Sequence, residues 1–369
     1  MRCFQVFRTP VGGLFRHVRD LTRGLAALGH EVGLVCDSTT GGPAAEDSLS
    51  ALAKVCRLGI HRLPIGRLPG LADVTAAAAI ARLATTMKPD ILHGHGAKGG
   101  VYARLAGSRL KIPALYTPHG GSLHYEWSDP RGAVFLAAER LLLRRGAGLL
   151  FVCDYERSVF ERKIGLGNLP SRVVHNGLWP EEFAGVAPDA YIRELVFLGE
   201  LRHLKGVGDL LEALALLKRT RPVSATLVGD GPDRRAFEAQ ARKLGLTDSV
   251  RFTGALPARQ AFGLGRLMVM PSRAESLPYV ILEAVAAAKP LLATRVGGIQ
   301  EILPPECLVE PASPAMLAKA IEQRLTRLED GEVLARSLAE TARTRFSAAG
   351  MCAKISVFYR DILAGTASR

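Results

Sequence analysis

The chain has 369 residues, which is more than a single hydrophobic core usually supports and is typical of two domains. Hydrophobic residues make up 48% and charged residues 22% of the chain, so a disordered or fibrous protein is excluded. The net charge is +13, with the larger share in the N-terminal half, which permits a nucleic acid, an anionic lipid or a phosphorylated substrate as partner.

Three sequence features predict a cytoplasmic location. The longest stretch without a charged residue, residues 112–125, contains Pro118, two adjacent glycines and two histidines, and is too short to cross a bilayer. The N-terminus passes directly into a strand-like run, without the apolar core or the cleavage site of a signal peptide. The six cysteines are scattered and form no C-x-x-C pair, which indicates buried reduced thiols rather than disulfides or a metal site.

Short apolar runs rich in β-formers alternate with longer segments of helical period, which predicts open parallel sheets with helices on both faces. Each half is expected to form its own doubly wound α/β domain. The predicted strands are residues 3–7, 32–36, 91–93, 114–117, 149–152 and 173–175 in the first half, and 195–198, 225–228, 250–253, 267–270, 290–293 and 308–309 in the second half.

The domain boundaries follow from the connecting segments. Residues 176–188 carry two glycines, two prolines and no clear period, as a linker between domains does. We therefore predict an N-terminal domain of residues 1–185 and a C-terminal domain of residues 186–345. Residues 346–369 are predicted to form a terminal helix whose apolar stripe needs a surface to cover.

The strongest motif lies in residues 275–284, just after the strand 267–270. Pro278 suits the first turn of a helix, so the backbone N–H groups of Ser276 and Leu277 are expected at a helix N-terminus. Such N–H groups bind phosphate.

Two glutamates frame this motif with seven residues between them. Glu275 is expected on the loop and Glu283 about a turn and a half into the helix, so both carboxylates can face one crevice at the end of the strand. Glu283 lies among apolar residues, where an unpaired carboxylate is costly. That cost argues against two ordinary surface glutamates.

The motif resembles that of the retaining GT-B glycosyltransferases of family four, and the resemblance covers essentially the whole chain. It implies two Rossmann-like domains that face a central cleft, with the last helix packed back on the N-terminal domain. It also implies that Glu275 contacts sugar hydroxyls of a nucleotide-sugar donor and that Glu283 binds the nucleotide ribose.

Weaker motifs in the N-terminal half follow the order found in that family. Gly12 and Gly13 open the first helix, where a backbone can approach a ligand closely. His93 and His95 form an H-x-H pair without an evident third ligand, so we assign them structural or acceptor-side roles and predict no bound metal. The resemblance places His119 in the cleft near the reacting sugar; a hydrogen-bonded core histidine is the alternative.

In the second half, residues 197–206 resemble the strand and loop that bind the donor diphosphate. Lys205 supplies a point charge for phosphate. The family has arginine directly after Gly199, whereas this chain has Glu200. We therefore expect Arg202 to supply the guanidinium from the loop.

A basic run follows in residues 131–145, with four arginines beside several apolar residues. This composition fits contact with anionic lipid or with a lipid diphosphate. A partly buried helix with a solvated basic end fits it equally well.

The combined interpretation is a metal-independent, retaining glycosyltransferase without a cofactor. It is expected to move a sugar from a nucleotide-sugar donor to a glycan or a lipid-diphosphate-linked acceptor in bacterial surface polysaccharide synthesis. His119 and Glu275 are the predicted catalytic residues, and contact with the inner face of the cytoplasmic membrane is expected. The alternatives are a sugar-nucleotide epimerase, a phosphorylase, a silent scaffold and a basic binding protein. Nucleic acid is not expected, because aromatic residues make up only 6% and the charges are dispersed.

Overall fold

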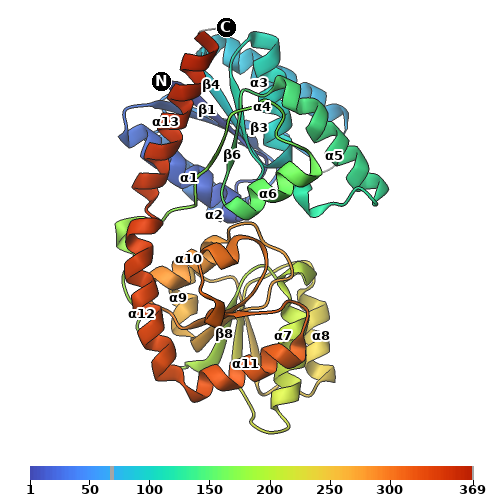
Figure 1. Cartoon of the computed structure of the whole chain (residues 1–369), viewed down its shortest axis with the longest axis vertical. Coiled ribbons are helices and arrows are strands. Elements are labelled where there is room, and N and C mark those ends of the chain that lie inside the picture. Colours follow the sequence, from blue (N-terminus) through green and yellow to red (C-terminus); the bar gives the residue numbers. More distant parts are fainter. Residues whose placement is uncertain (67–69, 368–369) are drawn as a thin grey trace. The chain divides into compact units, whose positions relative to one another are not determined.

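The computed structural model describes residues 1–66 and 70–367. The chain divides into two compact units (Figure 1). Unit 1 contains Met1–Gly177 together with Ala348–Arg369, and unit 2 contains Leu178–Ser347. The division therefore falls before the expected linker boundary at residue 186. A backbone hydrogen bond from Leu178 to the carbonyl of Phe346 joins the two ends of unit 2 and explains this position.

Unit 1 contains a seven-stranded parallel sheet with the order β3-β2-β1-β4-β5-β6-β7. The order reverses between β1 and β4, as in the doubly wound nucleotide-binding folds. The strands are β1 (Arg2–Val6), β2 (Glu31–Asp37), β3 (Ile60–Leu63), β4 (Ile91–His95), β5 (Ala114–Thr117), β6 (Gly148–Phe151) and β7 (Ser171–Val173).

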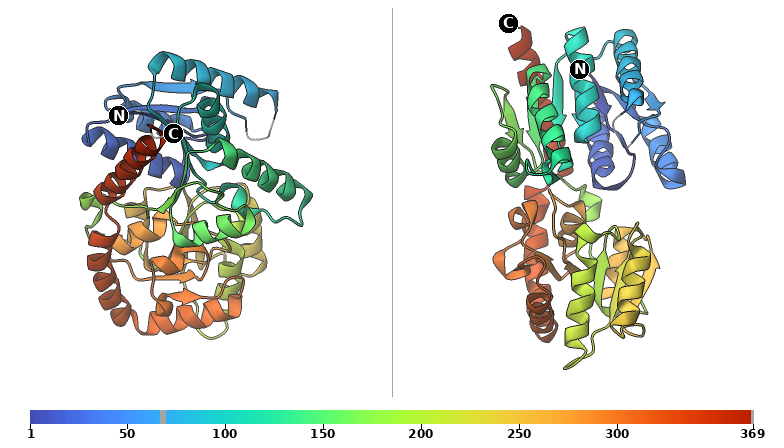
Figure 2. Two further views of the ribbon diagram at one scale, coloured as in Figure 1. Left: turned by 45° about the horizontal axis from the view of Figure 1, so that its top comes forward. Right: turned by 90° about the vertical axis from the view of Figure 1, so that its right-hand side faces the viewer.

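Helices cover both faces of this sheet because successive strand residues point to opposite sides. Cys3 of β1 belongs to the core under α1 and α13, whereas Phe4 and Val6 belong to the core under α3 and α4. The helices α1 and α13 lie side by side (Figures 1 and 2). The helices of the unit are α1 (Gly12–Ala27), α2 (Gly42–Ala53), α3 (Leu71–Met87), α4 (Gly96–Leu110), α5 (Pro130–Leu142), α6 (Asp154–Lys163) and α13 (Ala348–Ala367), with 3-10 turns η1 (Gly121–His124) and η2 (Leu143–Arg145).

Unit 2 repeats the scheme with a six-stranded parallel sheet of order β10-β9-β8-β11-β12-β13. Its order reverses between β8 and β11. The strands are β8 (Arg193–Leu198), β9 (Ala225–Val228), β10 (Val250–Gly254), β11 (Gly265–Met270), β12 (Leu291–Thr294) and β13 (Leu308–Val309).

One apolar core of unit 2 lies between its sheet and three of its helices, α7, α8 and α11. Helix α9 contacts β8 and β11, and α10 contacts α9 and α12. The helices are α7 (Val207–Leu217), α8 (Arg234–Lys243), α9 (Ala258–Gly263), α10 (Tyr279–Ala286), α11 (Pro314–Thr326) and α12 (Leu328–Arg345), with 3-10 turns η3 (Pro180–Glu182), η4 (His203–Lys205), η5 (Gly297–Glu301) and η6 (Pro305–Cys307).

The predicted fold class is confirmed: each unit is a doubly wound, Rossmann-like α/β domain. Strand β3 is an addition to the predicted set. All six cysteines are buried. Among the described residues, no helix combines the length and the apolar character needed to cross a bilayer.

Candidate functional site

The loops that leave the carboxyl ends of β8, β9 and β10 touch one another through glycines. Gly229 has a φ of +143°, and a Cβ on it would lie 1.9 Å from the carbonyl oxygen of Gly199. The N–H of Gly229 donates to the carbonyl of Gly254 (2.8 Å), and the N–H of Leu201 donates to that of Asp230 (2.9 Å). A side chain at Gly229 would push these loops apart, so the three loops form one connected rim.

A second close approach joins the β8 loop to the β11 loop across the point where the strand order reverses. Gly206 has a φ of +66°, and a Cβ on it would lie 1.8 Å from the carbonyl oxygen of Pro271. The N–H of Arg273 donates to the carbonyl of Leu204 at 2.8 Å. These contacts place Lys205 against the loop that carries the glutamate motif. Ligands of open α/β sheets bind at this kind of position.

Lys205 and Glu275 form an ion pair there. Lys205 Nζ donates to Glu275 Oε1 at 2.6 Å, and Ser272 Oγ donates to the same oxygen at 2.7 Å. The side chains are 25% and 9% exposed, so the pair is largely shielded from solvent. The structure therefore brings together the two side chains that the sequence assigns to phosphate and to sugar.

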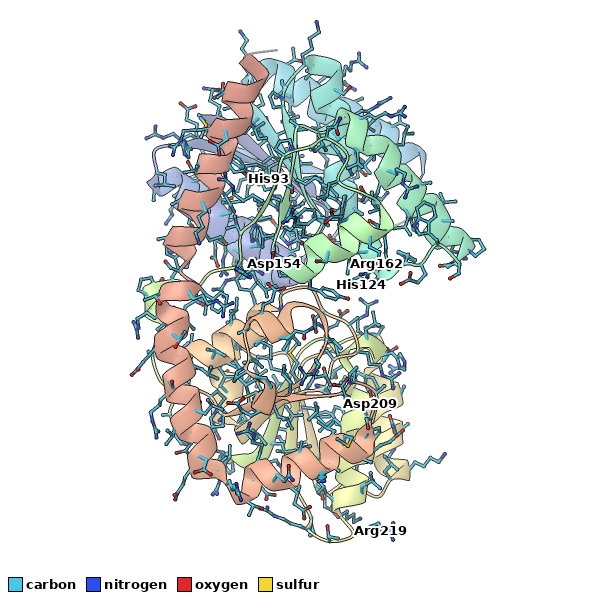
Figure 3. All side chains as sticks on the ribbon, viewed as in Figure 1. His93, His124, Asp154, Arg162, Asp209 and Arg219 are labelled. Carbon is cyan, nitrogen blue, oxygen red and sulfur yellow. The ribbon has the colours of Figure 1, made fainter. Side chains whose placement is uncertain are left out.

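Arg273 and Asp209 brace this arrangement, and neither was identified from the sequence. Arg273 donates to both carboxylate oxygens of Asp209, at 2.8 and 2.6 Å, and also lies 2.8 Å from Nε2 of His203. The hydrogen bond to Asp209 raises the pKa of Arg273. Asp209 is buried on α7 in unit 2 (Figure 3). The paired groups tie α7 to the β11 loop, and the contact with His203 ties the β11 loop to the loop that holds Lys205.

Helix α10 begins later than the sequence predicted. Its first residue is Tyr279, and Pro278 is the N-cap with ψ of 125°, so Pro278 does not lie in the first turn. Ser276 and Leu277 therefore precede the helix, and their N–H groups belong to a loop rather than to a helix N-terminus. The reason is a local tie: the carbonyl of Ser276 accepts a hydrogen bond of 2.7 Å from the N–H of Gly298.

The two glutamates lie on the segment that follows β11, Glu275 on the loop and Glu283 on helix α10. Gly297 has a φ of +58°, and a Cβ on it would lie 2.0 Å from the carbonyl oxygen of Glu275, so this glycine allows the β12 loop to support the glutamate. Glu283 lies in α10 and is half-buried between buried Leu282 and Ala284. The Gly297–Gly298 pair after β12 was the missed sequence signal for this support.

Arg202 lies at the start of η4, beside the residue that departs from the family pattern. Its guanidinium is 3.6 Å from Glu200 Oε2, and the two side chains are 40% and 49% exposed. An ion pair this exposed is weak. Arg202 therefore lies on the same loop as Lys205, and its side chain is accessible to solvent.

In unit 1, the first predicted glycine turn lies at the carboxyl end of β1. Gly12 has a φ of +72° and open space around its Cα, and both Gly12 and Gly13 are exposed. Val11 caps α1 without a side-chain hydrogen bond. The first N–H groups of α1 therefore open toward the carboxyl edge of the sheet.

His119 follows β5 at the same edge and has the unusual φ of +52°. The next residue is held by Glu156, whose Oε1 accepts from the N–H of Gly120 at 2.6 Å and whose Oε2 accepts from the N–H of Val152 at 3.0 Å. Nε2 of His119 lies 3.1 Å from Nδ1 of His95. Burial lowers the pKa of both imidazoles, so they are neutral at pH 7.

His93 has a different environment. Its Nδ1 lies 2.7 Å from the hydroxyl of Tyr359 on α13, and its Nε2 lies 2.8 Å from Oγ1 of Thr117. It is fully buried inside unit 1 (Figure 3). Both ring nitrogens thus have protein partners, which fits the structural role that the sequence indicated.

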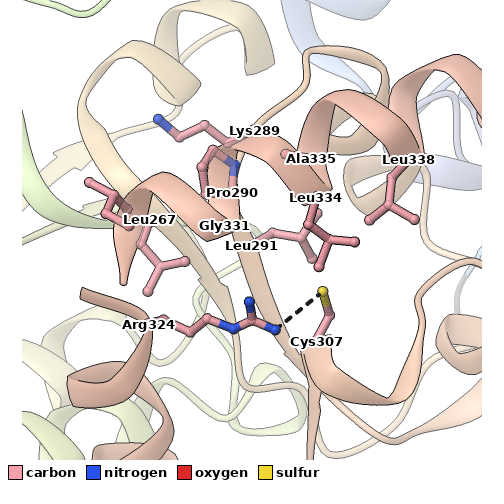
Figure 4. A pocket seen from close by; sticks show the side chains of 11 residues that line it. Leu267, Lys289, Pro290, Leu291, Cys307, Arg324, Gly331, Leu334, Ala335 and Leu338 are labelled. Atoms are coloured by element: carbon pink, nitrogen blue, oxygen red, sulfur yellow. Dashed lines mark hydrogen bonds between the residues drawn. The ribbon is translucent and has the colours of Figure 1, made fainter. Parts of the chain in front are cut away.

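A hollow at the opposite edge of the unit 2 sheet contains none of the predicted site residues (Figure 4). Lys289 and Pro290 lie there at the amino end of β12, and Arg324 Nη2 lies 3.8 Å from the sulfur of Cys307. Burial lowers the pKa of Lys289 to about 8. Because ligands of such sheets bind at the carboxyl ends of the strands, we interpret this hollow as a packing feature.

Comparison with known proteins gives matches along most of the chain. Residues 12–177 match the family described as "Glycosyl transferase 4-like domain", and residues 192–327 match "Glycosyl transferases group 1". A glycogen synthase of Mycobacterium tuberculosis is 28% identical over 89% of this chain and 90% of its own. A 2-deoxystreptamine glucosyltransferase of Streptomyces kanamyceticus is 28% identical over 83% and 87%.

Solved structures show the same fold. A sucrose-phosphate synthase from Thermosynechococcus elongatus superimposes with a TM-score of 0.83 at 21% identity, covering 99% of this chain and all of that one. HepE of Anabaena, solved in complex with UDP-glucose, gives a TM-score of 0.82 at 19% identity and covers 98% and 99%.

Proposed function

The chain belongs to the group 1 glycosyltransferases of the GT-B fold, and we propose that it transfers a sugar from a nucleotide-sugar donor to a glycan or lipid-linked acceptor, without a metal ion and with retention of configuration. The observation that carries the donor assignment is the pair Lys205–Glu275, 2.6 Å apart at the carboxyl edge of the unit 2 sheet. A cation and a carboxylate so close together suit the junction between a diphosphate and its sugar.

Lys205 and Arg202 bind the donor diphosphate in this proposal, together with the loop amides of Ser276 and Leu277. Two cations near the departing phosphate stabilise the charge that develops on the leaving group. The same charges remove the need for a bridging metal. Glycines at 206, 229 and 297 support this arrangement, because each permits one loop to approach a neighbouring loop.

Glu275 holds the hydroxyls of the donor sugar, and Glu283 binds the nucleotide ribose. Glu275 keeps its orientation through Ser272, which donates to the same oxygen as Lys205. A carboxylate held in this way can strengthen its hydrogen bonds as the sugar becomes oxocarbenium-like. HepE was solved with UDP-glucose, which supports a nucleoside diphosphate sugar as donor.

The acceptor and the reacting face of the sugar are assigned to unit 1. His119 contacts the reacting sugar, supported by the Glu156 contacts that fix the following residue. Gly12 and Gly13 leave the start of α1 open to a ligand. Retention proceeds by attack on the face from which the nucleoside diphosphate leaves, with no enzyme nucleophile.

Contact with an anionic membrane is a further part of the proposal, supported by the surface of α5 and η2. Val134 and Leu141 are 66% and 62% exposed, beside exposed Arg144 and Arg145. Arg140 is engaged elsewhere, because it stacks on Trp127 and donates to the carbonyl of Ile164. Exposed apolar and cationic side chains together favour an anionic lipid surface.

The donor assignment is tested by thermal unfolding with a panel of nucleotide sugars and the matching nucleoside diphosphates. A donor and its diphosphate should both raise the unfolding temperature of the wild type, since a ligand that binds the folded state stabilises it. Lys205→Ala should lose both shifts. Equal shifts in the wild type and in this variant contradict the assignment of the diphosphate site.

A further inference from the structure

Three histidines from separate elements of unit 1 meet at the carboxyl edge of its sheet. His17 comes from α1, His95 from the end of β4 and His119 from the turn after β5. The ring centroids of His17 and His119 are 4.8 Å apart, and those of His95 and His119 are 5.3 Å apart. One nitrogen of each ring lies within 4.8 Å of a nitrogen of the other two.

The hydrogen bonds of His17 fix where its proton lies. Its Nδ1 is 2.9 Å from the side-chain oxygen of Asn176, and an amide oxygen only accepts hydrogen bonds. Nδ1 therefore carries the hydrogen, and Nε2 presents a lone pair. Nε2 is buried and has no hydrogen-bond partner in the described part of the chain.

His95 is fixed in the same way by Gln5. Its Nε2 is 2.8 Å from Oε1 of Gln5, and the amide nitrogen of Gln5 donates to the hydroxyl of Tyr359 at 3.3 Å. The oxygen of Gln5 therefore faces His95, whose Nε2 carries the hydrogen. Nδ1 presents its lone pair toward Nε2 of His119, 3.1 Å away.

Histidines that bind metals are usually oriented by such a bond from the second ring nitrogen to a carbonyl oxygen. Here two of the three rings have one, to Asn176 and to Gln5. Burial also lowers the pKa of all three rings, that of His17 to about 4. All three imidazoles are thus neutral at pH 7, which is the form that binds a metal.

We propose that Nε2 of His17, Nδ1 of His95 and Nε2 of His119 bind one zinc ion. Tetrahedral zinc with Zn–N bonds of about 2.0–2.1 Å separates its ligand nitrogens by about 3.4 Å. The distance from His95 to His119 is already near this value, so His17 has the largest adjustment to make. Three imidazoles without a carboxylate select zinc, cobalt or nickel over magnesium, calcium or manganese.

Binding changes the protonation of His119. In the metal-free protein Nε2 of His119 donates its hydrogen to Nδ1 of His95, because the latter has only a lone pair. Zinc takes the place of that hydrogen at Nε2, and Nδ1 of the same ring takes up a proton, so the imidazole stays neutral. The fourth coordination position is open to water or to a hydroxyl of a ligand.

Zinc at this cluster would inhibit sugar transfer, and this consequence rests on the proposed function of His119. An imidazole nitrogen held by a metal ion no longer adjusts to the reacting sugar. Zinc binding itself does not rest on that assignment, so the two statements are tested separately.

Binding is measured by titrating the purified full chain with cobalt(II), whose tetrahedral complexes absorb visible light. We expect one cobalt ion per chain, displacement by zinc and no competition from magnesium. His17→Asn keeps a donor toward Asn176 but removes Nε2, and it should weaken cobalt binding at least tenfold. His61→Asn is the matched control, since His61 bonds to the carbonyl of Leu58 outside the cluster.

A second variant covers the case in which His17→Asn fails to fold. His119→Asn removes the third ligand, and asparagine tolerates the positive φ of that position. Unchanged cobalt affinity in a folded variant, or a thiolate charge-transfer band in the wild type, overturns the zinc site. Zinc that binds the cluster without slowing transfer leaves the site in place and contradicts the role of His119.

Discussion

The Lys205–Glu275 pair leads to the most detailed prediction for the donor site. Replacing Lys205 by alanine removes a charge-assisted hydrogen bond to phosphate, worth about 2 kcal/mol. It also leaves the carboxylate of Glu275, 9% exposed, facing the diphosphate without its cation. Two unit charges about 4 Å apart repel by about 4 kcal/mol at an effective dielectric constant of 20. We therefore expect binding of the nucleoside diphosphate to weaken by about 2–6 kcal/mol, roughly thirtyfold to more than ten-thousandfold.

Glu275→Gln should act in the opposite way on the nucleoside diphosphate. The amide retains an oxygen for the hydroxyl of Ser272 but carries no charge, so Lys205 is released toward the phosphates. We expect unchanged or slightly tighter binding and a turnover that falls about a hundredfold, because the lost contacts strengthen in the transition state. Glu275→Ala should likewise keep nucleoside diphosphate affinity, whereas Glu283→Ala should weaken donor and diphosphate alike through the ribose.

Calorimetry with the nucleoside diphosphate and with the donor, followed by steady-state kinetics, separates these outcomes. The double variant Lys205→Ala/Glu275→Gln should bind the diphosphate better than Lys205→Ala alone, because the repelling carboxylate is gone. Lys218→Ala is the matched control, since the Lys218 side chain donates to the carbonyl of Gly245 at the far end of α7. Lost diphosphate binding in Glu275→Gln with normal turnover at saturation would refute the division of roles.

Three further predictions address metal, membrane and stability. Transfer should survive a chelator; loss of activity that manganese restores would contradict the proposed phosphate site. The protein should float with anionic liposomes at low salt and dissociate as the ionic strength rises, and Arg144→Gln/Arg145→Gln should weaken this binding; no flotation at low salt would argue for a soluble acceptor. Lys289 has a pKa of about 8 in the folded protein against an ordinary lysine pKa of 10.5. The unfolded chain therefore binds more protons between these pH values, and the free energy of unfolding should rise with pH from about 8 to 10.5. Lys289→Met should abolish that rise and stabilise the protein by about 1–3 kcal/mol at pH 7; an unchanged pH profile in chemical denaturation would contradict this.

The fold was predictable because most strands are continuous apolar runs buried on both faces, the usual pattern of parallel sheets. Strand β3 was missed because it is not such an apolar run. It places His61 and Arg62 between Ile60 and Leu63 at the edge of the sheet, where His61 bonds to a loop carbonyl and Arg62 to the carbonyl of Asp37. An edge strand needs no apolar run, so its sequence gave no signal.

The candidate site was predictable where a motif is local in sequence. Glu275 and Glu283 belong to one segment, and Lys205 follows a strand end that the resemblance identifies. Arg273 and Asp209, which bond to each other, are 64 positions apart in the chain. No local sequence pattern predicts a contact at that separation. The start of α10 was misplaced because a hydrogen bond from Gly298, on another loop, holds the residues before it.

The histidine cluster shows the same limit more clearly. His95 was seen in the sequence only as part of an H-x-H pair with His93. The two histidines lie on the same face of β4, with ring centroids 4.0 Å apart, because they are two residues apart on the strand. Only their hydrogen-bond partners differ, since His93 bonds to Tyr359 and His95 to Gln5, and the sequence does not show these partners. His17, another member of the cluster, lies on α1. No metal-ligand spacing in the sequence connects His17 to the H-x-H pair.

Unit 1 is not continuous in the chain, and this has a consequence for how the protein is made. Its sheet is complete by Gly177, but α13, which supplies Tyr359 to the buried bonds of Gln5 and His93, begins only at Ala348. At about 5–20 residues per second, the ribosome spends on the order of ten to thirty seconds on residues 178–347 in between. During that interval the nascent first unit exposes the apolar surface beside α1 that α13 later covers. We expect chaperones to bind this exposed surface. Stop codons or proteolysis near the end of the chain would therefore damage the first domain to be synthesised, and a stand-alone version of that domain would require Gly177 to be joined to Ala348.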